Sequence, residues 1–496
     1  MRSLRALVTA LVFAAGALAQ QRPLDGKTID RVMTSTMRAW KIPGAAVAIV
    51  VNDRVVYANG YGLKDAAATD RVTADTLFQI ASTSKAFTTA ALAMLVDEKK
   101  LSWDDPVREH LDYFRLADDC ASAQVTIRDL VTHRTGLARH DELWDNTPLT
   151  REDVVRRIGF VPLSKPFRSA YQYQNIMFIA AGEVVSHASG MRWDDFVKTR
   201  IFAPLQMTHT VTSDADWAAS DHANGYRYDW TTGNVTPQRP IDTTTIGAGG
   251  AIKSSARDMA NWIRFQLAQG FFDNVQLVTP DALAETKTPQ TVIRLEGLTR
   301  DIKPETQLLS YAMGWNVQDY RGELVVSHAG ALNGFRTHVD LLPRRNLGFV
   351  ILSNLGRGMA LVALRNALVD VLTGKMGRDW NAYYLMVDRK SDEKDAKEKA
   401  DRQAKRQPNT TPSHPLAAYA GEYESRAYGI VNVSLAGEGL VLQWNRLTAP
   451  LAHFHYDVFT AVSEADEVDE QVAFASDADG TVNTLTFFGE TFTRRN

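Results

Sequence analysis

A serine and a lysine three positions apart, Ser82 and Lys85, form a pattern in this chain that could carry out chemistry. A serine hydroxyl is a weak nucleophile until a neighbouring base removes its proton. A lysine can be that base when burial or a nearby positive charge lowers its pKa. The same spacing recurs at Ser391 and Lys394 in a run of charged residues, so the spacing alone does not identify a site.

The surroundings of Ser82 favour chemistry over coincidence. Apolar residues recur with helical spacing from Phe87 to Leu95, which predicts a helix that begins near Thr83. Ser82 would then lie at the helix N-terminus, with Lys85 one turn further along and near the same face. The partial positive charge of a helix N-terminus favours an oxyanion that develops beside it. The structural alternative is a serine N-cap followed by a surface lysine.

A second pattern, Tyr173 and Asn175, lies where a loop is predicted to enter a helix. A covalent serine mechanism needs a proton shuttle to the leaving group and a wall that aligns the substrate. Tyr173 could relay the proton and Asn175 could hold a substrate amide. Residues 57–59 repeat the Tyr-x-Asn spacing, but they belong to a predicted hairpin that precedes Ser82.

A third pattern, His328 and Gly330, closes a predicted strand. The glycine would let a substrate backbone approach closely. The backbone amide of Ala331 could pair with that of Ser82 as an oxyanion hole. A histidine on a strand is by itself more often structural, so the prediction depends on the three patterns together.

The elements around these patterns predict an α+β fold. Residues 44–60 are two β-branched runs separated by Asn52-Asp53, which is typical of a hairpin. Helical periodicity covers about 175–187 and 257–269, and strand runs with turn residues cover 323–354. We therefore expect one antiparallel sheet built from both ends of the segment and covered by helices.

Composition divides the chain further. With 496 residues, 45% hydrophobic and 23% charged, two domains are expected, and a net charge of -3 argues against nucleic acid as a partner. We predict a hydrolase domain at 20–385, a charged helical linker at 386–412 and an antiparallel β-barrel at 413–496. The linker offers little apolar surface, so we expect the barrel to be separable from the chemistry.

Residues 1–19 have the basic start, apolar run and small-residue end of a cleavable signal sequence. The mature protein is therefore expected to be secreted or periplasmic. Cys120 is the only cysteine, so no internal disulfide can form there. The apolar stretch 347–372 is interrupted by asparagine and arginine, and no membrane span is expected after signal cleavage.

The order Ser-x-x-Lys, Tyr-x-Asn and His-x-Gly resembles the serine β-lactamase-related family. That family includes class C β-lactamases, D-alanyl-D-alanine carboxypeptidases, D-aminopeptidases and several esterases. The likeness covers roughly residues 27–372 and extends to the segments THRTGL at 132, IFAPLQMTHT at 201, GAGGAIKSSARDMANW at 247 and HAGALNGF at 328.

The resemblance implies a role for each patterned residue. Ser82 would be the nucleophile, Lys85 its base and Tyr173 the proton shuttle. Asn175 would bind a substrate amide and His328 would line the far wall. It further implies an α/β sandwich beside an all-helical region with the site between them, and a C-terminal barrel similar to the lipocalin-like domain of some members.

His328 is a departure from the many relatives that carry lysine at this position. A lysine can bind a substrate carboxylate, whereas histidine is largely neutral at pH 7. An ester or D-amino-acid peptide is therefore at least as good a substrate candidate as a β-lactam. We expect the preference for carboxylate substrates to rise as His328 is protonated between about pH 8 and 6. Arg336 could supply the missing charge, although a solvated arginine is the simpler interpretation.

Three functions remain open from the sequence. The first is a hydrolase that cleaves a small-molecule or short-peptide amide or ester through an acyl-enzyme, with no metal or cofactor. The second is a penicillin-binding sensor that acylates without efficient turnover, and the third is a non-catalytic binding protein that works through its barrel. His453 and His455 could share a strand face, but a third metal ligand is not evident. The natural substrate, its stereochemistry and the oligomeric state are left open.

Overall fold

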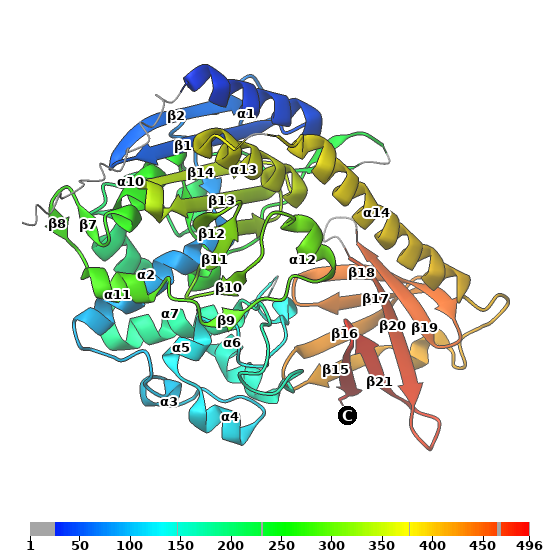
Figure 1. Ribbon diagram of the computed structural model, residues 1–496. Helices are drawn as coiled ribbons and strands as arrows, with labels where there is room; N and C mark the ends of the chain where they lie inside the picture. The colour runs from blue at the N-terminus through cyan, green and yellow to red at the C-terminus, as the bar shows by residue number, and fades with distance from the viewer. Residues whose placement is uncertain (1–24, 146, 230–231, 376, 464–467, 496) are drawn as a thin grey trace, which may run out of the picture.

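A large antiparallel sheet organises the first part of the protein (Figure 1). The computed structural model describes residues 25–145, 147–229, 232–375, 377–463 and 468–495, so the predicted signal sequence lies outside the described residues. The strands of the sheet are, in spatial order, β2 (Arg54–Gly62), β1 (Gly44–Val51), β14 (Leu347–Ser353), β13 (Phe335–Leu342), β12 (Glu323–Leu332), β11 (Asn316–Tyr320), β10 (Leu309–Tyr311) and β9 (Thr291–Val292).

The sheet is assembled from both ends of this region, as the sequence predicts. The first hairpin turns at Asn52 and Asp53, whose φ angles of 49° and 61° fit a type I′ turn. Strand β1 then pairs with β14, with Val47 opposite Ile351, and β14 continues to β13 and β12. The α+β fold class is confirmed.

Both faces of the sheet are covered. Alternate residues of β1 point to opposite faces, and one set, from Ala45 to Ile49, packs with α1 (Gly26–Trp40) and α13 (Gly358–Thr373). The other set, from Ala46 to Val50, faces α10 (Ala256–Leu267) and the helical region. This second face carries the candidate site.

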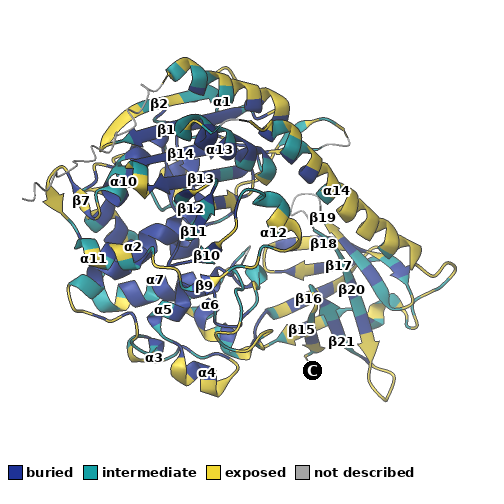
Figure 2. Ribbon diagram, viewed as in Figure 1, coloured by how far each residue is buried: buried dark blue, intermediate teal, exposed yellow. Residues whose placement is uncertain are grey.

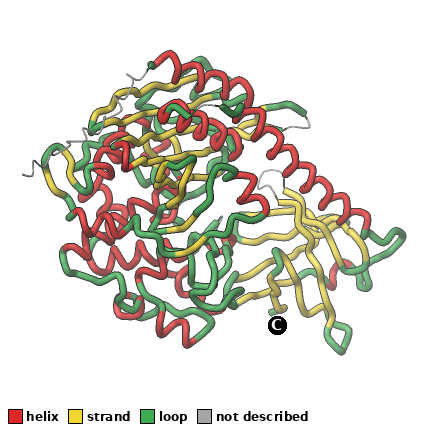
Figure 3. The backbone as a smooth tube through the Cα atoms, in the orientation of Figure 1, coloured by secondary structure: helices red, strands yellow, loops and turns green. Residues whose placement is uncertain are grey.

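A helical region lies against the second face, and Figure 3 separates its helices from the strands of the sheet. Its centre is the pair α2 (Ser84–Asp97) and α7 (Ile176–Ser189), both deeply buried. Among the described residues, no helix is both long enough and apolar enough to cross a membrane. The shorter helices are α3 (Val107–His110), α4 (Asp119–Gln124), α5 (Ile127–Leu130), α6 (Arg151–Arg157), α8 (Trp193–Val197), α9 (Asp214–Ala218), α11 (Pro280–Glu285) and α12 (Gly297–Ile302).

Short two-stranded ribbons complete the first part of the chain. They are formed by β3 (Phe78–Gln79) with β6 (Lys253–Ser254), β4 (Tyr226–Tyr228) with β5 (Val235–Pro237), and β7 (Phe271–Phe272) with β8 (Val275–Gln276). The first ribbon leads directly into the turn that carries Ser82.

The C-terminal part is a closed barrel of eight antiparallel strands. The register closes where Tyr423 lies opposite Arg494, and the interior contains packed aromatic side chains. The predicted barrel is confirmed. Its strands are β15 (Gly421–Ser425), β16 (Gly429–Ala436), β17 (Gly439–Trp444), β18 (Leu447–His455), β19 (Val458–Ser463), β20 (Val468–Ser476), β21 (Val482–Phe487) and β22 (Glu490–Arg494).

Helix α14 (Trp380–Ala404) connects the two parts (Figure 1). It begins before the charged run, because Trp380 and Tyr384 are buried in the same core as α13. Its later turns are exposed, as Figure 2 shows. Lys399 and Arg402 from these turns each lie 2.7 Å from Asp469 of the barrel. The charged segment therefore docks on the barrel as well as linking it to the sheet.

Candidate active site

Ser82 lies in a tight turn, Ala81–Thr83, immediately before α2. Ala81 has a φ of 51°, a left-handed conformation that is strained for alanine and is typical of functional sites. Strand β12 runs directly against this turn. A Cβ on Gly330 would lie 2.1 Å from the Ile80 carbonyl oxygen, so only glycine lets the two backbones approach so closely.

Lys85 is fully buried and points at the serine. Its Nζ lies 3.1 Å from Ser82 Oγ, 2.7 Å from Asn175 Oδ1 and 2.7 Å from the Gly249 carbonyl oxygen. Burial, and then the charge of Arg139, hold the pKa of Lys85 well below its usual range. A neutral amine has two hydrogens, which it can donate to Asn175 Oδ1 and to the Gly249 carbonyl oxygen. Its lone pair is then left for the Ser82 hydroxyl, as a general base requires.

Tyr173 lies on the other side of the nucleophile. Its ring centroid is 5.0 Å from Lys85 Nζ, and Ser82 is among the groups that act on the pKa of its hydroxyl. Burial raises the pKa of Tyr173, and this outweighs the opposite effects of the Ser82 hydrogen bond and Arg139. The environment thus favours the protonated form of Tyr173 and the neutral form of Lys85. Titratable neighbours whose pKa values are pushed apart in this way are suited to acid and base roles.

Asn175 has both ends of its amide engaged by the protein. Its Oδ1 accepts from Lys85, and its Nδ2 donates to Asp141 Oδ1 at 2.9 Å. Asp141 also accepts from Trp144 Nε1 at 2.7 Å and is paired with Arg139. These contacts give Asn175 a positioning role toward Lys85, beside the substrate-binding role inferred from sequence.

The loop from Arg139 to Trp144 was missed by the sequence analysis. Its residues form no spacing pattern with Ser82, and they reach the site only because the chain folds back over Asn175. The clustering of charged residues with a tryptophan in RHDELW was the available signal.

The charge of Arg139 in this loop predicts how the activity depends on pH. Arg139 lowers the pKa of Lys85, so removing its charge makes the ammonium form less unfavourable and raises that pKa. Because the base must be neutral to act, we expect Arg139→Gln to move the acid limb of the kcat/KM profile to higher pH. Arg227→Gln is the matched control, since Arg227 lines the same cavity but is not among the charges acting on Lys85. An unchanged acid limb in Arg139→Gln would contradict the electrostatic account.

The prediction that His328 lines the substrate wall needs correction. His328 is only 3% exposed, and the described residues that line the cavity do not include it. Its Nδ1 lies 2.7 Å from the Ala329 carbonyl oxygen, so Nδ1 carries the single hydrogen of the neutral ring and donates it to that oxygen. Its Nε2 accepts from the Tyr311 hydroxyl at 3.0 Å. The imidazole ring therefore packs behind the cavity wall, where its hydrogen bonds are to Tyr311 and Ala329.

The expected protonation of His328 between pH 8 and 6 is also corrected. Burial, and then the charge of Lys85, lower the pKa of His328 to about 3. We expect the kcat/KM ratio of carboxylate-bearing to neutral substrates to stay constant from about pH 8 to 6, with the same flat ratio in His328→Asn. A ratio that rises as the pH falls in the wild type alone would show that the imidazole is protonated and acts on the substrate.

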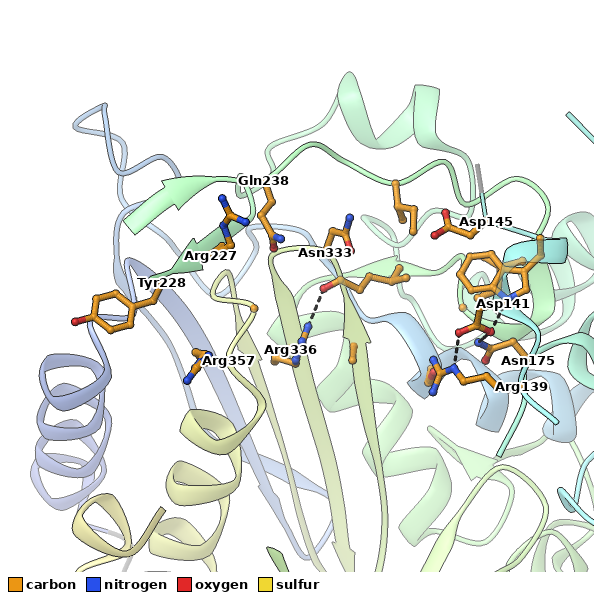
Figure 4. Close-up of a pocket in the computed structure, with 18 residues that line it drawn as sticks. Arg139, Asp141, Asp145, Asn175, Arg227, Tyr228, Gln238, Asn333, Arg336 and Arg357 are labelled. Carbon is orange, nitrogen blue, oxygen red and sulfur yellow. Dashed lines mark hydrogen bonds and ion pairs between the residues drawn. The ribbon is translucent and has the colours of Figure 1, made fainter. Parts of the chain in front are cut away.

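A cavity of about 370 Å³ opens above Ser82. Figure 4 shows Arg139, Asp141 and Asn175 at one end and Arg227 and Gln238 at the other. Its other lining residues include Ser82, Asp145, Tyr228, Ala331, Asn333, Arg336 and Arg357.

The structure therefore brings Ser82, Lys85, Tyr173 and Asn175 into one cluster, with Ala331 on the cavity wall. Arg336 also lines the cavity and is not simply solvated. Its guanidinium donates to the Leu332 and Phe335 carbonyl oxygens at 2.8 and 2.7 Å. The guanidinium of Arg336 therefore places a positive charge in the cavity wall.

Known family models match both parts of the chain. A family model described as Beta-lactamase matches residues 29–373, and a second, described as a domain of unknown function (DUF3471), matches residues 405–495. The chain is 32% identical over 427 residues to the unguisins hydrolase ungD′ of Aspergillus campestris (strain IBT 28561), covering 82% of this chain and 77% of that protein.

Two other matches extend over more of the chain. Identity to the unguisins hydrolase ungD of Aspergillus violaceofuscus (strain CBS 115571) is 30% over 473 residues, covering 88% and 83% of the two chains. The structure of the octameric penicillin-binding protein homologue from Pyrococcus abyssi covers 95% of this chain and 99% of its own, with a TM-score of 0.62 and 20% identity. At 20% identity, the likeness to the Pyrococcus abyssi structure shows a shared fold alone.

Proposed function

Because the chain belongs to the Beta-lactamase family, we propose that it is a serine hydrolase that cleaves an amide or ester bond through an acyl-enzyme on Ser82. The family and the hydrolase names of its relatives support the reaction class. The observation that carries the assignment of Ser82 is the buried Lys85 amine 3.1 Å from its hydroxyl, with two other acceptors occupying the amine hydrogens.

The proposed reaction has two halves. Lys85 takes the proton of Ser82 as Oγ attacks the substrate carbonyl, and the amides of Ser82 and Ala331 stabilise the oxyanion. The bond to the leaving group then breaks as Tyr173 donates its proton to the leaving-group atom. Lys85 passes the proton that it took from Ser82 to the Tyr173 phenolate. In the second half, water attacks the acyl-enzyme and loses a proton to Lys85. The bond between the acyl group and Ser82 Oγ breaks, and Lys85 returns that proton to Oγ.

The cavity supports a polar, peptide-sized substrate. Its volume of about 370 Å³ lies at the lower end of the range for small-molecule sites. Arginine, asparagine and glutamine side chains in its lining can donate to carbonyl or carboxylate oxygens. We favour a short peptide amide or an ester as the substrate. Because the guanidinium of Arg336 lines the cavity and can bind a carboxylate, a β-lactam stays among the substrates to be tested.

A location outside the cytoplasm is part of the proposal. It rests on the signal-like pattern of residues 1–19. Determining the N-terminus of the protein recovered from a periplasmic or culture fraction would test it. A new terminus near Gln20 is expected, and an intact Met1 in a cytoplasmic fraction would refute the location while leaving the chemistry standing.

A hydrolysis panel tests the reaction class. Aryl esters, D- and L-amino-acid amides and a chromogenic cephalosporin would each be assayed with the wild type and Ser82→Ala. Turnover of an ester or amide that Ser82→Ala abolishes is expected. Stable acylation without turnover would favour the penicillin-binding alternative, and activity equal in both proteins would refute the role of Ser82.

A further inference from the structure

The C-terminal barrel touches the loop that holds the candidate base. The hydroxyl of Tyr428, at the start of the barrel, lies 2.5 Å from Nδ1 of His140 and donates to Glu490 Oε1 at 3.2 Å. Tyr428 is buried, and His140 is itself in a left-handed conformation, with a φ of 43°. This contact joins two residues 288 positions apart in the chain.

His140 occupies a sensitive position in the loop. It lies between Arg139, whose charge lowers the pKa of Lys85, and Asp141, which holds Asn175 against Lys85. A shift of the His140 backbone would therefore move both neighbours relative to the amine. The barrel contact is one residue away from each of them.

A second barrel contact lies on another segment of the cavity wall. Arg446, in the turn between β17 and β18, lies 2.7 Å from Asp242. The residue before Asp242, Ile241, lines the cavity, as does Ile246. The barrel thus contacts two separate segments of the cavity rim, the loop that contains His140 and the segment around Asp242.

We propose that the barrel positions the cavity rim, with Tyr428 and Arg446 as positioning residues for the reaction at Ser82. Tyr428 would fix the loop that orients Asn175 and Lys85, and Arg446 would fix the segment around Ile241. The inference rests on the proposed function. It also replaces the expectation of a separable barrel, which was based on the charged linker and could not include contacts outside it.

Tyr428→Phe in the full-length protein is the first test. The substitution keeps the packed ring and removes the hydroxyl that contacts His140. We expect the second-order rate constant for labelling of Ser82 by a fluorophosphonate to fall about three- to tenfold, the size of one hydrogen bond's contribution. Loss of stability alone would reduce the fraction of protein that labels but not the rate constant of that fraction.

Tyr423→Phe is the matched control. Tyr423 is also buried in the barrel, but its hydroxyl donates to the Tyr419 carbonyl oxygen at 2.9 Å and not to a cavity loop. The rate constant should be unchanged in Tyr423→Phe. Equal rate constants in wild type, Tyr428→Phe and Tyr423→Phe would overturn the role of Tyr428.

A double-mutant cycle with His140→Ala tests whether the contact itself carries the effect. Tyr428→Phe should have little further effect in the His140→Ala background, because the partner is already lost. Additive effects would overturn the coupling. His140→Ala alone also tests the contact from the hydrolase side should Tyr428→Phe fail to fold, and a wild-type labelling rate in that variant would overturn the proposal.

Arg446→Ala tests the second contact. Exposed ion pairs contribute little to stability, so the variant should fold. We expect a changed ratio of kcat/KM between bulky and small esters, whereas Arg495→Ala, which removes a comparable pair with Glu422 at 2.9 Å, should leave it unchanged. An unchanged ratio in Arg446→Ala would overturn this half of the proposal. If the wild type itself does not label at Ser82, the proposed function fails first, so the two failures are distinguishable.

Discussion

Replacing Lys85 with methionine should lower kcat by at least about 10²-fold, the usual contribution of a group that transfers a proton. Methionine fills a similar volume and can be buried without charge, but it offers no lone pair of sufficient basicity to Ser82. The amine lies 3.1 Å from Ser82 Oγ, whereas burial raises the pKa of Tyr173, the other titratable neighbour of Ser82, and so makes that residue an unsuitable base in place of Lys85. Steady-state hydrolysis of an activated aryl ester measures the loss.

Lys394→Met is the internal control for this prediction. Ser391 and Lys394 repeat the Ser-x-x-Lys spacing on α14, but the Lys394 side chain is 74% exposed and lies 3.5 Å from Glu398. Its kcat should equal that of the wild type. Near-normal activity in Lys85→Met would show that Lys85 is not the base that activates Ser82, and that its spacing from Ser82 has only a structural role.

Tyr173→Phe should also lower kcat by at least about 10²-fold, because it removes the proton donor while preserving the ring. The effect should be largest for substrates with poor leaving groups, such as amides, since these need protonation as the bond breaks. An activated aryl ester leaves more easily and should be less sensitive. The amide-to-ester ratio of kcat in the two proteins measures this difference.

Tyr171→Phe provides the comparison for Tyr173→Phe. Tyr171 belongs to the same aromatic cluster, with its ring 5.7 Å from those of both His133 and Tyr311. It contributes packing, and Ser82 is not among the groups that act on the pKa of its hydroxyl, as it is for Tyr173. An equal loss in both variants, without a change in the amide-to-ester ratio, would assign the effect to packing and refute the proton-donor role.

The parts of the fold that the sequence predicted are those determined by short-range patterns. The turn at Asn52 and Asp53, the helix after Ser82 and the helix after Asn175 each depend on residues within a few positions of one another. The order of the motifs then indicated the family, and the closed barrel followed from its strand runs. Local patterns were sufficient for these features because the local preference and the final fold agree.

The features that the sequence did not predict depend on burial and on distant contacts. His328 was placed on the substrate wall, but its position is determined by Tyr311 and by the turn before Ser82, which lie in other segments. The loop around Asp141 and the contact between His140 and Tyr428 likewise join residues far apart in the chain. Spacing within one segment carries no information about such pairs, so they require the three-dimensional structure.

The nucleophilic role of Ser82 is tested most directly by intact-mass analysis after reaction with a fluorophosphonate. The wild type should gain the mass of a single adduct, mapped to Ser82, and Ser391→Ala should label in the same way because that serine lies on the exposed charged helix. Ser82→Ala should gain no adduct. Equal labelling of wild type and Ser82→Ala, or no labelling of the folded wild type, would contradict the assignment of this serine as the nucleophile.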